Sequence, residues 1–313
     1  YDLTTENLTS WNPDANGNVA AISVSGTKVY VGGSFSTVGG QNRSRIAALD
    51  PSTGILSEWA PNADGWIYGI AATDSVVYVA GEFSTIGGQS RSRIAAVNIN
   101  DGTATDWSPG ANDWAYTVSV DGSNVFVGGY FKIIGGKNRN CLAALDSLTG
   151  TATDWNPDVN GSVNSLVLAN STLYLCGSFT SIGGQTRNNI GSVDLETGTV
   201  TSWNPNADGY VNSIALSGST IYAAGNYTTI GGASRYCLAA LDTTTGNATE
   251  WNPNPGSSVN AIAVSGSTVY VGGWFDTIGA TSRSKIAAID SSTGEVTGWN
   301  PHANNVIHML RIF

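Results

Sequence analysis

Apolar and polar residues alternate in short runs along the chain, and the runs recur in a fixed order. Within residues 252–299, the β-branched run "VNAIAVSG" ends at a Ser-Gly pair, and "STVYVGGWF" follows at once. A Gly-bearing loop, "DTIGATSR", leads to "KIAAID", and the turn "SSTG" leads to "EVTGWNP". Runs of this kind, bounded by Gly, Ser and Asn, predict β-strands. No segment has the helical period, so we expect four antiparallel strands in each repeat and no helix.

The same order returns every 48 residues without an insertion. Tryptophans mark the period at Trp11, Trp59, Trp107, Trp155, Trp203, Trp251 and Trp299. Arginines mark it at Arg43, Arg91, Arg139, Arg187, Arg235 and Arg283, and aromatic residues at Phe35, Phe83, Phe131, Phe179, Tyr227 and Phe275. A period of about 20–50 residues indicates a solenoid, a propeller or an array.

Six repeats of four short strands predict an all-β fold, a six-bladed β-propeller. A ring buries each blade between its neighbours, whereas an open β-solenoid, the alternative, has shorter repeats. We therefore expect a single domain over residues 1–313. Its repeats are expected at about 12–59, 60–107, 108–155, 156–203, 204–251 and 252–299, followed by a surplus C-terminal segment, 300–313.

The residues of one repeat also resemble a known family. The stretch "VYVGGSFSTVGGQNRSRIAALDPSTG" with the later "WAPNADG" is similar to the delta-sixty repeat β-propellers of extracellular bacterial and archaeal proteins. The resemblance covers essentially the whole chain. The sequence departs from the family pattern at few positions. Asn98 stands where an Asp recurs, and Ala280 stands where the loop has Gly. The resemblance implies the propeller fold and an extracellular or cell-surface location, and no particular activity.

The two ends of the chain repeat each other, because residues 1–25 align with residues 289–313. "ENLTSWNP" and "GEVTGWNP" are both fourth-strand sequences, and only one can close a sixth blade. The extra half-repeat is therefore expected to be shared between the termini, with one strand packed elsewhere or in an incomplete seventh blade. The final "NVIHMLRIF" resembles a first strand without partners, which favours pairing with another chain.

Residues that recur in every repeat are interpreted as structural. The tryptophans are expected to fill the space between blades. The arginines are expected to tie a loop to a neighbouring blade through their five donors, with an anion-binding ring of arginines as the alternative. Asp50, Asp146, Asp194, Asp242 and Asp290 precede "xxTG" turns and are expected to accept backbone N–H bonds. "DANGN" at 14–18 resembles part of a calcium loop but lacks the distal Glu, which favours a turn.

Two positions vary strongly between repeats. The first precedes the first strand and holds Asn18, Trp66, Trp114, Ser162, Tyr210 and Ser258. The second follows the second strand and holds Ser34, Glu82, Tyr130, Ser178, Asn226 and Trp274. Because the two strands form a hairpin, we expect both positions on one face, near the centre of the ring.

The fold does not require aromatic residues at these positions, because other repeats hold Asn or Ser there. Large aromatics on one face predict a binding surface, with capping of the channel as the alternative. The predicted ligand-binding residues are Trp66, Glu82, Trp114, Tyr130, Tyr210 and Trp274. An aromatic ring near a carboxylate suits a sugar, a peptide or a cation. Tyr68 and Tyr116 are expected on the other face of their strands, packed between blades.

Composition and charge exclude several classes of protein. The net charge of −10 leaves no basic stripe for nucleic acid. No apolar run approaches the roughly 20 residues of a membrane span. No signal peptide is visible, and the start at Tyr1 is interpreted as a mature or trimmed product. Cys141 and Cys237 occupy equivalent positions two repeats apart, so no disulfide is expected between them, and with Cys176 they lack zinc spacing.

No catalytic residue, metal site or cofactor is predicted. His302 and His308, the only histidines, lie in the C-terminal half-repeat, so no Ser–His pair can form in the ring. A glycosidase needs paired carboxylates, and nothing pairs Glu82 with Asp276. We expect a non-enzymatic, secreted module that binds glycan or peptide, and six Asn-x-Ser/Thr sequons are compatible with an exported glycoprotein. The alternative is a surface-layer or filament subunit, self-assembled through residues 300–313.

Overall fold

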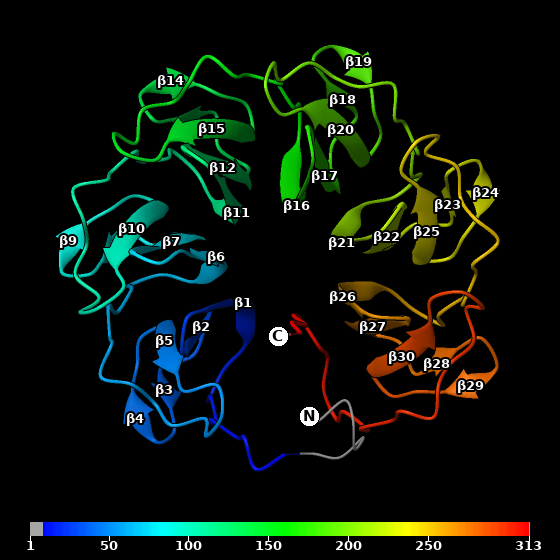
Figure 1. The fold of residues 1–313 in the computed structure, drawn as a ribbon, viewed down its shortest axis with the longest axis horizontal. Coiled ribbons are helices and arrows are strands. Elements are labelled where there is room, and N and C mark those ends of the chain that lie inside the picture. Colours follow the sequence, from blue (N-terminus) through cyan, green and yellow to red (C-terminus); the bar gives the residue numbers. More distant parts are fainter. Residues whose placement is uncertain (1–8, 313) are drawn as a thin grey trace. The chain divides into compact units, whose positions relative to one another are not determined.

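The computed structural model describes residues 9–312 (Figure 1). The chain divides into two compact units, one up to Asn156 and one from Pro157 to Ile312. Each unit contains three three-stranded antiparallel sheets, numbered here as blades 1–3 and 4–6 in chain order. The described residues contain strands and turns but no α-helix, and therefore no helix that could cross a membrane. The prediction of an all-β fold is confirmed.

In each blade of the first unit, the second strand in chain order lies in the middle of the sheet. Blade 1 consists of β1 (Val19–Ser25), β2 (Lys28–Gly33) and β5 (Ile46–Leu49). Blade 2 consists of β6 (Ile67–Ala72), β7 (Val76–Gly81) and β10 (Ile94–Asn98), and blade 3 of β11 (Ala115–Asp121), β12 (Asn124–Gly129) and β15 (Leu142–Asp146). The first strands contact one another, with β6 between β1 and β11 (Figure 1).

The second unit repeats this arrangement. Blade 4 consists of β16 (Ser162–Ala169), β17 (Thr172–Ser178) and β20 (Ile190–Asp194). Blade 5 consists of β21 (Val211–Ser217), β22 (Thr220–Gly225) and β25 (Leu238–Asp242), and blade 6 of β26 (Val259–Ser265), β27 (Thr268–Gly273) and β30 (Ile286–Asp290). Here β21 lies between β16 and β26.

The loop predicted after the second strand is a small hairpin in every blade, which corrects the sequence interpretation. The hairpins are β3 (Thr37–Val38) with β4 (Gln41–Asn42), β8 (Thr85–Ile86) with β9 (Gln89–Ser90), β13 (Ile133–Ile134) with β14 (Lys137–Asn138), β18 (Ser181–Ile182) with β19 (Gln185–Thr186), β23 (Thr229–Ile230) with β24 (Ala233–Ser234), and β28 (Thr277–Ile278) with β29 (Thr281–Ser282). Gly87 and Gly88 form one of the turns, both with positive φ, which glycine adopts without strain. Strands of two residues are too short to show an alternating pattern.

The predicted fourth strand is reduced to a short edge segment. A single β-bridge, such as that between Leu49 and Leu56, holds it to the third strand, and Ser57 N donates to Ala48 O beside it. The segment ends early because the chain then turns away from its own sheet. Trp59, two residues later, donates from Nε1 to Asn98 O of the next blade at 2.9 Å.

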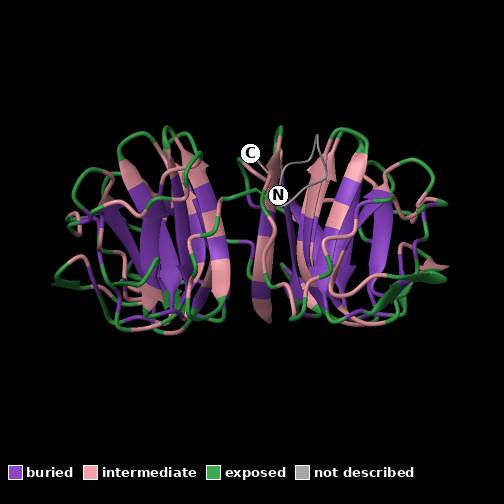
Figure 2. Ribbon diagram, turned by 90° about the horizontal axis from the view of Figure 1, so that it is seen from below, coloured by how far each residue is buried: buried purple, intermediate pink, exposed green. Residues whose placement is uncertain are grey.

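The core lies between neighbouring blades. Buried side chains of blade 2, such as Tyr78 and Ile94, pack with Val118 and Val127 of blade 3. Trp107 closes this space, because its ring lies 5.0 Å from that of Tyr78 and its Nε1 donates to a carbonyl of blade 3. The predicted role of the periodic tryptophans is confirmed. In both units the buried residues follow the three main strands of each blade, and the exposed residues lie in the turns and in the small hairpins (Figure 2).

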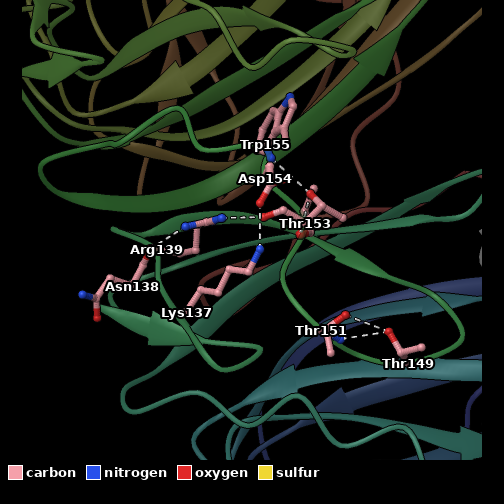
Figure 3. A network of polar contacts seen from close by, with 9 residues as sticks. Lys137, Asn138, Arg139, Thr149, Thr151, Thr153, Asp154 and Trp155 are labelled. Atoms are coloured by element: carbon pink, nitrogen blue, oxygen red, sulfur yellow. Dashed lines mark hydrogen bonds and ion pairs between the residues drawn. The ribbon is translucent and has the colours of Figure 1, made fainter.

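The periodic arginines connect two segments of one repeat, which corrects the predicted link to a neighbouring blade. Arg139 donates from its two Nη atoms to Asn138 O and Thr153 O, beside the Lys137–Asp154 ion pair of 2.8 Å (Figure 3). Thr153 lies in the edge segment of the same blade. The side chain therefore holds the small hairpin against that segment. Equivalent bonds are made by Arg43, Arg91, Arg187, Arg235 and Arg283.

The predicted aspartate turns are confirmed. Asp50 Oδ1 accepts from Ser52 N at 2.9 Å and from Thr53 N at 2.7 Å, and these hydrogen bonds lower the pKa of the carboxyl. At 14–18, Asn16 Oδ1 likewise accepts from two backbone N–H groups, as in a turn. Residues 9–312 contain no group of three or more His, Cys, Asp or Glu side chains suited to a metal ion. Cys141, Cys176 and Cys237 are buried thiols.

Residues 300–312 dock on blade 6 as the first strand of a following blade does. A Cβ on Gly272 would lie 2.5 Å from Ile307 Cγ2, and one on Gly32 would lie 2.5 Å from Ile67 Cγ2. Ser284 Oγ also donates to Ala303 O at 3.0 Å. The N-terminal counterpart, "ENLTSWNP", begins outside the described residues.

Candidate functional site

The two variable positions of each blade are hydrogen-bonded neighbours, as predicted. Glu82 N donates to Trp66 O at 2.9 Å, and Tyr130 N donates to Trp114 O at 2.8 Å. The equivalent pairs are Ser34 with Asn18, Asn226 with Tyr210, and Trp274 with Ser258. The start of the first strand and the end of the second therefore share one end of each of these sheets.

A glycine fixes the backbone beneath the variable residues. A Cβ on Gly81 would lie 2.1 Å from Trp66 O, and a Cβ on Gly129 would lie 2.2 Å from Trp114 O. Real side chains do not tolerate such a distance, so these two positions require glycine. The backbone is thus held in one conformation, while the side chains at positions 66 and 114 are free to vary.

A β-bulge in the first strand brings two more aromatic residues to this surface. Ile67 and Gly69 pair with β7, whereas Tyr68 between them has no partner there. A bulge changes the direction of side chains along a strand. The Tyr68 ring lies 6.3 Å from Trp66 and 5.5 Å from Tyr116. The expectation that both tyrosines lie on the other face was therefore wrong, although they do pack between blades.

Four rings form one continuous series, called the aromatic row: Trp66, Tyr68, Tyr116 and Trp114, in that order. Consecutive centroids are 6.3, 5.5 and 6.4 Å apart, with interplanar angles of 66, 70 and 60°. These edge-to-face contacts are worth about 0.5–1.5 kcal/mol each beyond burial, so they hold the rings in place. The two tryptophans at the ends are 45% and 43% exposed. The row is a fixed apolar surface that remains open to a ligand.

A carboxylate lies beside the aromatic row. Tyr68 Oη donates to Glu82 Oε2 at 3.1 Å. Burial, and then the charge of Glu82, raises the pKa of Tyr68, so the phenol is protonated at neutral pH. Burial, and then the charge of Asp113, raises the pKa of Tyr116 in the same way. No cation forms an ion pair with Glu82 within residues 9–312, so the carboxylate retains acceptor capacity for a ligand.

Tyr130 and a lysine extend this surface on blade 3. Tyr130 is 50% exposed, and Lys132 Nζ lies 5.9 Å from its ring centroid. The same Nζ lies 3.7 Å from Cys141 Sγ. Sequence reasoning missed Lys132, although the position could have been found by comparing repeats. Its equivalents are Ser36, Ser84, Thr180, Thr228 and Asp276.

A third variable position was also missed. It precedes the third strand and has a positive φ, between 59 and 70°, at Arg45, Arg93, Cys141, Asn189, Cys237 and Lys285. Non-glycine residues in this conformation are strained and cluster at functional sites. Arg93 Nη1 donates to Glu82 O at 2.9 Å, and Lys285 Nζ donates to Trp274 O at 3.1 Å. Side chains from this position thus support the second variable position.

The six residues that the sequence predicts to bind a ligand separate into two groups. Trp66, Glu82, Trp114 and Tyr130 come together on blades 2 and 3. In the second unit, Tyr210 and Trp274 are 47% and 56% exposed. Neither ring contacts another aromatic ring within the described part of the chain. Asn226 Nδ2 donates to Tyr210 Oη at 2.9 Å.

Known proteins provide matches in sequence and in structure. Residues 11–204 match the family described as outer membrane protein assembly factor BamB. No curated protein gives a significant match. The WD40 β-propeller domain of Doa1 has a TM-score of 0.63 and 12% identity, over 95% of this chain and 85% of that one. The computationally designed Ika8 protein has a TM-score of 0.57 and 14% identity, over 97% and 94%. At such identities the likeness concerns the fold alone, a β-propeller of repeated antiparallel sheets.

Proposed function

This chain belongs to the family described as outer membrane protein assembly factor BamB, and we propose that it is a non-enzymatic recognition module that binds glycan or peptide through the aromatic row. The observation that supports this function is the continuous contact of four rings on blades 2 and 3. In blade 4 the corresponding positions hold Ser162 and Asn164. The fold therefore does not need the rings, and exposed aromatics without a structural role indicate binding.

The chemistry of the surface suits either ligand class. The exposed rings of Trp66 and Trp114 contact the C–H faces of sugars or the apolar side chains of a peptide. Glu82 accepts hydrogen bonds from sugar hydroxyls or from a basic side chain. Lys132 provides a donor at the blade 3 end. Because the rings are held before the ligand arrives, little side-chain entropy is lost on binding.

We also propose the finer architecture. Three blades in each unit support a ring of six blades over residues 1–313, with the two ends of the chain forming an incomplete seventh. The docking of residues 300–312 on blade 6 supports the second part. The delta-sixty resemblance supports a location outside the cell or on its surface.

An array of glycans and peptides, probed with the full chain, tests the proposal. The variant Trp114→Ser should lose the ligands that the native chain binds, because it removes one end of the aromatic row. The matched control is Ile55→Ser, which removes a 68% exposed apolar residue in a turn and should leave binding unchanged. If Trp114→Ser binds the same ligands as Ile55→Ser with equal affinity, the aromatic row is not the binding site. Recovery of a chemically altered ligand would contradict the non-enzymatic role.

A further inference from the structure

The two blades that carry the aromatic row also carry two carboxylates that the other blades lack. Glu82 stands where the other repeats have Ser34, Tyr130, Ser178, Asn226 and Trp274. Asp113, next to Trp114, stands where they have Gly17, Gly65, Gly161, Gly209 and Ser257. Both carboxylates are half-buried. A half-buried carboxylate is less hydrated than one in water, so a nearby cation stabilises it.

Asp113 is a side chain that the fold does not require. In blade 2 a Cβ on the equivalent Gly65 would lie 2.7 Å from Phe83 Cα, so the backbone there excludes any side chain. Blade 3 makes room for one, and Asp113 Oδ1 accepts from Trp114 N at 2.8 Å. Because most of the other blades fold with glycine at this position, the carboxylate is better explained by the surface beside it than by the blade.

Each carboxylate lies beside an inner ring of the aromatic row. Tyr68 Oη donates to Glu82 Oε2 at 3.1 Å. Burial raises the pKa of Tyr116, and the charge of Asp113 is the next largest cause, to which Glu82 adds. The rings of Tyr68 and Tyr116 are 5.5 Å apart. Both negative charges are therefore close to the middle of the row.

Two cations of the chain lie near these carboxylates, but both make other contacts. Lys132 Nζ lies 3.7 Å from Cys141 Sγ. Arg93 Nη1 donates to the backbone oxygen of Glu82 at 2.9 Å. Within residues 9–312, neither cation forms an ion pair with Glu82 or Asp113. The surface thus combines aromatic faces with carboxylates that are open to a cation from outside.

We propose that the aromatic row binds an arginine side chain of a peptide segment, which pairs with Glu82 and stacks on the exposed ring of Trp66. A planar guanidinium stacks on aromatic faces, and its N–H groups match the two oxygens of a carboxylate. The net charge of −10 also attracts a basic ligand. This inference rests on the proposed function and narrows its ligand from glycan or peptide to a basic peptide.

The charge at this surface favours arginine over a neutral sugar. Sugar hydroxyls need hydrogen-bond acceptors, and an amide or hydroxyl side chain provides them without a charge. The chain has such side chains at the equivalents of Glu82, at Ser178 and Asn226. Only the blades with the four contacting rings have carboxylates instead. A cation gains from both the rings and the charges, whereas a neutral sugar gains little from the charges.

Two blocked peptides are the probes, one with a single arginine among glycine and serine, and one with citrulline, the neutral isostere, in its place. The indole N–H signals of Trp66 and Trp114 in the full chain, identified with the Trp→Ser variants, follow binding by NMR. The arginine peptide should bind at least about tenfold more tightly than the citrulline peptide. Glu82→Gln should bring this ratio close to one. The matched control is Asp74→Asn, which removes an exposed carboxylate at the opposite end of the blade 2 hairpin and should preserve the ratio.

Three results would overturn the arginine proposal. The first is equal affinity for the two peptides, and the second is an arginine preference that persists in Glu82→Gln. The third is a preference that Asp74→Asn also abolishes, because net charge alone would then explain it. If array ligands are lost in Trp114→Ser but retained in Glu82→Gln, the proposed function stands and the arginine proposal fails. If neither the array ligands nor the peptides depend on Trp66 and Trp114, both proposals fail.

Discussion

Tyr68 donates a hydrogen bond to Glu82 across the blade 2 hairpin at 3.1 Å, and its ring contacts Tyr116 of blade 3. This one residue therefore joins the carboxylate of one variable position to the aromatic row of two blades. Tyr68 is the unpaired residue of the β-bulge in β6, between Ile67 and Gly69. The aromatic row and the Glu82 carboxylate therefore form one surface, and a substitution at Glu82 should change the pKa of Tyr68.

The first prediction concerns the ionisation of Tyr68. Burial and the Glu82 charge raise its pKa, so Glu82→Gln should lower that pKa by removing the charge. Phenolate absorbance, with Tyr68→Phe identifying the signal, measures the change. A raised pKa contributes stability that is complete below the ordinary value of about 10 and is lost as pH rises above it. The native chain should therefore lose stability above pH 10 more steeply than Tyr68→Phe. Identical titrations in the native and Glu82→Gln chains would disprove the coupling.

The second prediction separates periodic from variable tryptophans. Trp107 is buried between blades 2 and 3 and donates to Asp146 O at 2.9 Å. Trp107→Ala should lower the free energy of unfolding by about 3–5 kcal/mol, as expected for a large core truncation. Trp274→Ser, at a 56% exposed residue, should lower it by less than about 1 kcal/mol. Urea unfolding measures both, and similar losses would show that the variable tryptophans are core residues.

The third prediction concerns Asp64, whose side chain accepts from Ser84 N at 2.8 Å and Thr85 N at 2.9 Å. Burial raises the pKa of this carboxyl, but the Ser84 hydroxyl and these two backbone bonds lower the pKa by more, and the net value is about 2. The resulting stability is present above the ordinary pKa of about 3.9 and is lost as pH falls toward 2. Asp64→Asn should remove this acid dependence with little loss at pH 7, because Asn112 makes the same two backbone bonds.

The matched control for this position is Asp64→Ala, which removes the acceptor altogether. It should lower the free energy of unfolding by about 1 kcal/mol at pH 7. Unfolding in urea at pH 7 and between pH 2 and pH 4 compares the three chains. Equal acid sensitivity of the native chain and Asp64→Asn would show that this carboxylate does not contribute.

The sequence was sufficient for the features that repeat. The 48-residue period predicted the strands, the buried tryptophans and the Asp50 type of turn, because each depends on local residue types. The hairpin argument also placed Trp66 beside Glu82 correctly, since antiparallel pairing has only one geometry at that end of the sheet.

Features that depend on register or on contacts between segments were missed. Tyr68 was assigned to the wrong face, although side chains two residues apart along a strand share a face and the pattern alone therefore places Tyr68 beside Trp66. The hairpin of β8 and β9 was missed because its strands have two residues each. The partner of Arg139 could not be predicted, because a long side chain reaches either its own edge segment or the next blade.

The most direct test of the binding surface is the affinity of Trp66→Ser for a ligand that the array identifies. The account predicts a loss of affinity of about tenfold or more. It also predicts a change in unfolding free energy below about 1 kcal/mol, because Asn18 and Ser162 occupy the same position in other blades. The control Ile55→Ser should retain native affinity. Unchanged affinity in Trp66→Ser, or a variant that unfolds readily, would contradict the claim that Trp66 serves recognition and not packing.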